Sequence, residues 1–162
     1  MVHEGTLNKD NVWFYTWTKN DLPRGSNEIV FFLAHILLQL EDKIQTGQYS
    51  NLRLFADSCS GQNKNKTMMV FLLSYIQNSP LFDVIEVVFP IRGHSYLPAD
   101  RSFGHIEKQY RRHEVLKSPK DYQRILSNYG QVKKYGLDWI CNDFKKFSND
   151  IFKLYIKLVY VL

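Results

Sequence analysis

Apolar and polar residues alternate along this chain in two periods, one typical of β-strands and the other typical of helices. Four segments are rich in β-branched and aromatic residues and have the lengths of strands. Strands are predicted at residues 11–18, 52–56, 82–90 and 131–135. Residues 1–3 are interpreted as the stub of a preceding strand, which a turn at 4–11 would join to the first full strand.

Between these strands apolar residues recur every three or four positions, which is the helical period. Helices are predicted at residues 28–45, 64 or 65 to 77, 99–115, 119–128 and 137–147. Ser26 and Asn27 are candidate N-caps of the first helix, and Ser118 before Pro119 supplies a cap and an N1 proline. Strand, helix and strand over residues 52–90 form the pattern of a βαβ unit with parallel neighbours.

The chain has 162 residues, enough for one domain with a real core. We expect one α/β domain over residues 1–150, with a mixed sheet flanked by helices. Residues 151–162 form an apolar tail, which we interpret as a docked strand or helix, or as a truncated or foreign end. The tail is too short to cross a bilayer, which takes about 20 residues. No apolar leader follows Met1, so an intracellular protein without a membrane partner is expected.

Composition narrows the class of protein without deciding its function. Hydrophobic residues make up 44% of the chain, which favours a globular protein over a disordered one. The net charge of +5 permits a polyanionic partner such as DNA. Cys59 and Cys141 lie far apart and in no CxxC pair, so neither a zinc site nor a disulfide framework is indicated. Reduced thiols are the simpler interpretation.

The first candidate site is the loop that follows the predicted strand at 52–56. Asp57 stands at the strand end, where open α/β sheets collect their ligands. Hydrogen-bonding side chains follow at Ser58, Ser60, Gln62, Asn63 and Asn65. These side chains fit a metal's outer shell or a sugar-phosphate backbone, and equally fit a loop that caps the next helix. A P-loop is not indicated, because no second glycine precedes Lys66 and Thr67.

The second candidate site lies in residues 92–107. Asp100 and Glu107 are seven positions apart, which places both carboxylates on one face of a helix with Gly104 between them. His94 precedes them and has three possible roles: a base, a ligand or a hydrogen-bonding loop residue. A small residue at 104 would leave room for a ligand or another backbone.

A basic run follows these acids in the sequence. It consists of Lys108, Arg111, Arg112 and Lys117. It can be a solvated helix face or an edge that contacts phosphates. The acids Asp57, Asp100 and Glu107 would repel one another unless a cation neutralised them, and oxygen-only ligation suits Mg²⁺ or Mn²⁺. Two such ions can stabilise the attacking and the leaving oxygen when a phosphodiester bond is displaced.

Three motifs carry a resemblance to a known family. They are Arg24-Gly25-Ser26-Asn27-Glu28, the run Asp57-Ser58-Cys59-Ser60-Gly61-Gln62-Asn63-Lys64-Asn65, and Gly93-His94-Ser95-Tyr96-Leu97-Pro98-Ala99-Asp100-Arg101 with residues 103–108. In these motifs the chain resembles an uncharacterised domain family that occurs in many copies in animal genomes and is associated with transposon-derived genes. The order of elements is also similar to the RNase H-like fold of DDE-type transposases and integrases.

This resemblance implies a set of roles for the acids. In DDE enzymes acids on the first strand, at the end of the fourth strand and on a later helix bind two metal ions. Asp57 would take the place of the second acid, and Glu107 or Asp100 that of the third. The first strand would precede residue 1, so the RNase H-like sheet is expected to lack it, and Glu4 and Glu28 are the available substitutes for its acid.

The sequence therefore supports two functional hypotheses. The first is a transposase-derived, RNase H-like domain of nuclear location that uses Mg²⁺ or Mn²⁺ to act on DNA phosphodiesters, with Asp57, Glu107 and His94 as catalytic residues. The second is a non-catalytic domain that binds nucleic acid or protein. The candidate nucleic-acid contacts in both are Gln62, Asn63, Lys64, Asn65, Arg101, Lys108, Arg111 and Arg112.

Overall fold

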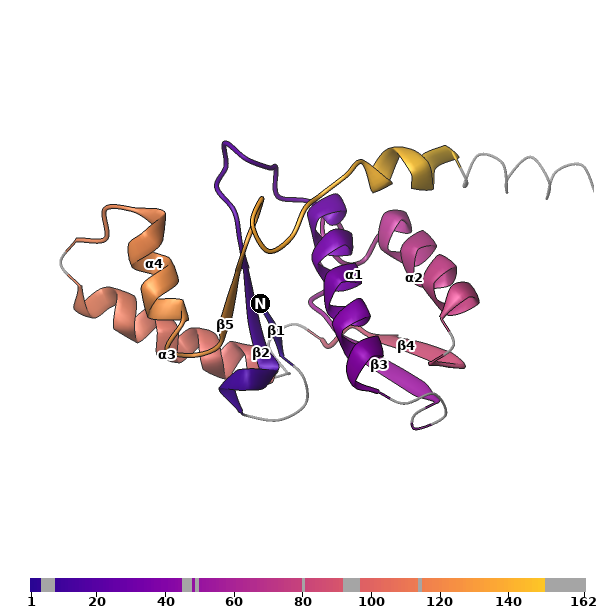
Figure 1. The fold of residues 1–162 in the computed structure, drawn as a ribbon, viewed down its shortest axis with the longest axis horizontal. Coiled ribbons are helices and arrows are strands. Elements are labelled where there is room, and N and C mark those ends of the chain that lie inside the picture. Colours follow the sequence, from indigo (N-terminus) through magenta and orange to yellow (C-terminus); the bar gives the residue numbers. More distant parts are fainter. Residues whose placement is uncertain are drawn as a thin grey trace, which may run out of the picture. The chain divides into compact units, whose positions relative to one another are not determined.

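A computed structural model describes residues 1–3, 8–44, 48, 50–79, 81–91, 97–113 and 115–150. Its elements in chain order are β1 (Val2–His3), η1 (Lys9–Asn11), β2 (Val12–Thr16), α1 (Ser26–Lys43), β3 (Asn51–Phe55), α2 (Lys66–Asn78), β4 (Val84–Val88), α3 (Pro98–Arg112), α4 (Pro119–Leu126) and β5 (Gln131–Lys134). The chain divides into two compact units, which Figure 1 shows. Unit 1 comprises 1–22 and 93–140, and unit 2 comprises 23–92 and 141–162.

Unit 1 is built on a small mixed sheet with the order β1-β2-β5. β1 runs antiparallel to β2, and β5 runs parallel to it. The aromatic run of β2 supplies the core, because Val12 and Phe14 pack with Ile106 of α3. α3 and α4 lie side by side (Figure 1), and the rings of Tyr110 and Tyr122 meet edge to face at 5.2 Å. The buried face of α3 is thus fixed by this sheet.

Unit 1 ends in a tight turn, and the helix predicted at 137–147 does not form there. The Asp138 carboxylate accepts a hydrogen bond from the Lys134 backbone N–H at 2.7 Å, and Gly136 has a φ of +76°. Such a φ favours glycine and breaks a helix. The helix predicted at 137–147 is therefore wrong over its first half, and the chain becomes helical only at residues 144–150.

Unit 2 contains the βαβ unit expected from residues 52–90. β3 and β4 run parallel, with Leu52 opposite Ile85, and α2 connects them. α1 and α2 pack against each other, and α2 also packs on β4. The apolar stripes predicted from the helical period are buried at Val30, Phe32, Leu33, Ile36 and Leu37 of α1 and at Met68, Val70 and Leu72 of α2.

The structure confirms a mixed α/β protein, and its described strands form two small sheets, one in each unit. One predicted cap is wrong: α1 begins at Ser26 after an N-cap at Gly25, so Ser26 and Asn27 lie inside the helix. Gly25 can act as the N-cap because the Glu28 carboxylate accepts a hydrogen bond from its backbone N–H at 2.8 Å. The predicted Ser118 cap before Pro119 is confirmed. The 4–7 part of the predicted turn and the tail at 151–162 lie outside the described residues.

Candidate functional site

The loop from Asp57 to Asn65 leaves the carboxyl end of β3 and leads into α2, as predicted. Asp57 is exposed, and its carboxylate accepts hydrogen bonds from the Asn63 side-chain amide and from the Cys59 backbone N–H. The backbone N–H groups of residues 62, 63 and 64 all donate to the Cys59 carbonyl, at 3.1, 2.8 and 3.1 Å. The Asp57 and Asn63 side chains therefore satisfy each other, and the Cys59 carbonyl satisfies the backbone of the turn.

Asn65 completes this internal network. Its side-chain oxygen accepts the Met68 backbone N–H at 3.1 Å, which caps α2, and its amide donates to the Ser60 carbonyl at 3.0 Å. Lys64 lies 5.4 Å from the centroid of the Phe89 ring, a cation–π distance. Of the two roles considered for the loop, capping and backbone satisfaction is the one that the contacts of Asn63 and Asn65 support.

The Arg24–Glu28 motif lies directly against this loop within unit 2. A Cβ built on Gly25 would come within 3.9 Å of the Gly61 carbonyl, so the two backbones nearly touch. Glu28 is only 2% exposed, and its carboxylate accepts the Gly25 backbone N–H. Two of the three sequence motifs thus meet, and both their acids bind backbone N–H groups of their own segments.

Asn27 has a role that sequence reasoning missed. Its amide donates to the Asn142 carbonyl at 2.7 Å and to Cys141 Sγ at 3.2 Å, and its oxygen accepts the Lys145 backbone N–H at 3.1 Å. These bonds tie residues 141–145 to the start of α1. Burial, followed by the charges of Glu28 and Asp143, raises the pKa of the Cys141 thiol to about 11. Cys141 is therefore a neutral structural thiol and not a nucleophile.

In unit 1, the acids of α3 also have local partners. The Asp100 carboxylate accepts the Leu97 backbone N–H at 2.9 Å and so closes the first turn of α3. Glu107 forms an ion pair with Arg111 at 2.6 Å, one helical turn later. Both acids are exposed and lie on one side of α3, as the seven-residue spacing predicts. Their partners give each a structural role.

The predicted metal site spans both units, since Asp57 belongs to unit 2 and Asp100 and Glu107 belong to unit 1. In the part of the chain that the structure describes, no three His, Cys, Asp or Glu side chains form a group suited to a metal ion. His94 lies outside the described residues. The Mg²⁺ or Mn²⁺ site therefore stays a prediction.

Three basic residues of α3 differ from its acids, because they have no acidic partner among the described residues. Arg101, Lys108, Arg111 and Arg112 are all exposed. Among the described residues the ion pairs are Arg53 with Glu86 and Arg111 with Glu107, so Arg101, Lys108 and Arg112 have no acidic partner there. Gly104 is exposed between them. We call Arg101, Gly104, Lys108 and Arg112 the basic stripe of α3.

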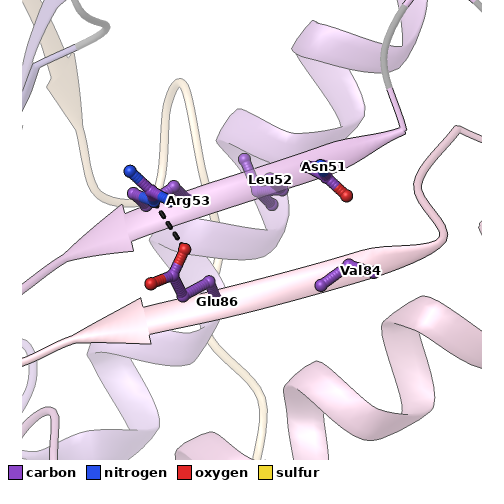
Figure 2. Close-up of a pocket in the computed structure, with 5 residues that line it drawn as sticks. All are labelled: Asn51, Leu52, Arg53, Val84 and Glu86. Carbon is purple, nitrogen blue, oxygen red and sulfur yellow. Dashed lines mark hydrogen bonds and ion pairs between the residues drawn. The ribbon is translucent and has the colours of Figure 1, made fainter.

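A shallow hollow lies on the β3–β4 pair, and Figure 2 shows its lining. Its volume is about 400 Å³, and its lining consists of Asn51, Leu52, Arg53, Val84 and Glu86. Arg53 and Glu86 point toward each other from neighbouring strands and pair at 2.5 Å. Because the two charges of the hollow satisfy each other, no side chain of its lining is left to bind a charged ligand.

Comparison with known proteins places the chain in a family. Residues 1–154 match the model of the family described as Domain of unknown function (DUF7869). The chain belongs to this family. No curated protein matches it, and no solved structure does. Among the described residues, no helix has the length and hydropathy that crossing a membrane takes.

Proposed function

We propose that this DUF7869 domain binds nucleic acid through the basic stripe of α3. The observation that carries the proposal is a contrast on this one helix: its acids Asp100 and Glu107 have local partners, whereas most of its cations have no acidic partner among the described residues. Protein–nucleic acid affinity comes largely from Lys and Arg side chains that neutralise phosphates and release counterions. Arg101, Lys108 and Arg112 are exposed and available for that role.

The spacing of these cations makes them act together. Arg101, Lys108 and Arg112 stand at positions i, i+7 and i+11 of α3, so they follow one line on the helix surface. The stripe is about 16 Å long at a rise of about 1.5 Å per residue. Phosphates on one DNA strand are separated by about 3.4 Å along the axis, so such a stripe can meet several of them. We therefore expect the chain to bind the DNA phosphate backbone with an affinity that falls as the salt concentration rises.

The other predicted contacts are less suited to this role. The side-chain amides of Asn63 and Asn65 donate hydrogen bonds within the loop, and Arg111 is paired with Glu107. Gln62 and Lys64 stay candidates at the edge of unit 2. The transposase-derived, RNase H-like origin and the nuclear location belong to this proposal as well. The three motifs and the parallel β3–α2–β4 unit support the origin, and the nuclear location follows from DNA as the proposed partner.

A metal-dependent nuclease is the competing function from the sequence. Its acids Asp57, Asp100 and Glu107 each hold a local hydrogen bond or ion pair through one carboxylate oxygen, so their presence is explained without a cation. Binding without catalysis needs no cation. We therefore place binding first.

The test is duplex DNA binding by the full chain at increasing KCl, with EDTA and with Mn²⁺. We expect log K to fall linearly with log[KCl], with a slope of about −2.7 if three phosphates are neutralised. EDTA is expected to leave the affinity unchanged. In a parallel plasmid assay, Mn²⁺-dependent nicking that Asp57→Asn abolishes would establish the nuclease instead. If the chain does not bind duplex DNA at low salt, the proposal is wrong.

A further inference from the structure

Gly104 is a glycine that the described fold does not require. It lies in the interior of α3 and is exposed, and a Cβ built on it would meet no atom within 4 Å. Its φ is not in the left-handed region, since Gly136 is the residue with positive φ among those described. Glycine inside a helix is less stable than alanine, because it loses more backbone freedom on folding. Its presence here therefore needs a reason outside the packing of unit 1.

Gly104 also occupies a special place on the helix surface. It lies two residues before the buried Ile106, and Lys108 lies two residues after it, so both face about 160° away from the core contact. Gly104 follows Arg101 by three positions and precedes Lys108 by four, which places it within the basic stripe. The point of α3 farthest from its own core is therefore bare backbone, with Arg101 and Lys108 on one side of it and the acids Asp100 and Glu107 on the other.

We infer that Gly104 lets the backbone of α3 enter the major groove of a B-form DNA duplex, with the cations of the stripe on the flanking phosphates. This inference rests on the proposed function. A helix about 10–12 Å in diameter fits a groove about 12 Å wide, and the fit is closest where the helix carries no side chain. Positive charge on the stripe complements the phosphates on one rim of the groove.

The chemistry of the stripe favours a DNA duplex over other nucleic acids. Single strands are held by aromatic side chains on which bases stack. α3 presents one exposed apolar aromatic ring, Phe103, which is 49% exposed and lies outside the stripe. The major groove of an RNA duplex is too narrow and deep for a helix to read. We therefore commit to duplex DNA as the occupant.

The experiment compares the wild-type chain with Gly104→Ala and Gly104→Leu in thermal unfolding and in binding of a duplex. Gly104→Ala is expected to raise Tm by about 3 °C, because alanine stabilises a helix interior. The same change is expected to weaken binding about tenfold and Gly104→Leu about a hundredfold, since each adds atoms at a close contact. Gln77→Leu, at an exposed position of α2, is the control for an added leucine and should bind like wild type.

The outcomes separate the two proposals. Equal affinity of wild type, Gly104→Ala and Gly104→Leu would overturn the role of Gly104, while a salt-dependent wild type would leave the basic stripe standing. If an RNA duplex or a single strand competed for the protein as well as duplex DNA does, the major groove of DNA would not be the binding site of α3. A wild-type chain that does not bind duplex DNA at low salt would remove both.

Discussion

The Asp57–Asn65 loop and helix α3 look alike in the sequence and differ in the structure. Both combine acids with a basic or amide-rich run, and both contain one of the three motifs found in the sequence. In the loop, Asp57, Asn63 and Asn65 bind one another or nearby backbone. On α3, the acids are similarly occupied, but Arg101, Lys108 and Arg112 have no acidic partner among the described residues.

This difference shows how polar residues divide between structure and binding. A carboxylate or amide that satisfies a helix end or a loop is explained by that structural role, whether or not it also binds a ligand. An exposed cation without a partner loses only water and counterions. The available binding capacity of the described chain therefore lies more on α3 than on the loop.

The largest expected effect comes from reversing the charges of the stripe. The triple variant Arg101→Glu, Lys108→Glu and Arg112→Glu should lower duplex affinity more than about a hundredfold at low salt, since each removed phosphate contact also weakens the salt slope by about 1. Fluorescence anisotropy with a labelled duplex measures this. The control, Lys19→Glu, Lys145→Glu and Lys146→Glu, changes net charge equally at other exposed positions. If both variants lose affinity alike, total charge and not α3 binds the DNA.

The second effect tests the loop as a structural element. Asn65→Ala should lower the free energy of unfolding by about 1 kcal/mol, because it removes the N-cap of α2. Duplex affinity should stay within about twofold of wild type, since α3 is untouched. Urea unfolding and anisotropy measure the two quantities, with the exposed Asn128→Ala as a control. A loss of affinity at unchanged stability would instead make the loop a DNA contact.

Much of the fold could be predicted from the sequence because its signals are local. The helical period located α1 and α2, the alternating apolar residues Leu52 and Leu54 located β3, and a run of β-branched residues located β4. The exception is instructive: apolar residues after 137 imitate a helical period, yet the left-handed Gly136 and the Asp138 hydrogen bond impose a turn. Backbone conformation at one glycine outweighed the pattern.

The candidate site was less predictable, for two reasons. Asn27 binds residues more than a hundred positions away, and no spacing rule reveals such a partner. The local partners of the acids did have a signal, since Glu107 and Arg111 have the i,i+4 spacing of a helical ion pair. A carboxylate with a cation one turn away is explained before any metal is invoked.

A smaller effect concerns that ion pair. Glu107→Gln should change the free energy of unfolding by less than about 0.5 kcal/mol, because the pair is well exposed. It should strengthen duplex binding about threefold, because it removes a negative charge near the stripe and releases Arg111. Glu86→Gln breaks the exposed Arg53 pair of unit 2 with the same charge change and should leave binding as it is. Loss of a Mn²⁺-dependent activity in Glu107→Gln would restore its role as a ligand.

The smallest effect is a pH dependence in α4. Hydrogen bonds from the Ser118 side chain and backbone lower the pKa of Asp121 below its ordinary 3.8. A lowered folded-state pKa stabilises the protein above the ordinary value, and the contribution disappears as pH falls through the folded pKa. Asp121→Asn should therefore be less stable than wild type at neutral pH, and the difference should shrink below about pH 4. A constant difference in Tm across this range would contradict the assignment, and the exposed Asp83→Asn serves as reference.

Lysine footprinting tests most directly which region binds DNA. The full chain is acetylated with and without a duplex at low salt, and the modified lysines are identified by mass spectrometry. Lys108 represents the stripe, Lys64 the loop, and Lys145 and Lys146 are exposed references. The account predicts that DNA protects Lys108 and leaves the other three as reactive as before. Protection of Lys64 with an unprotected Lys108 would contradict it and move the binding site to the loop.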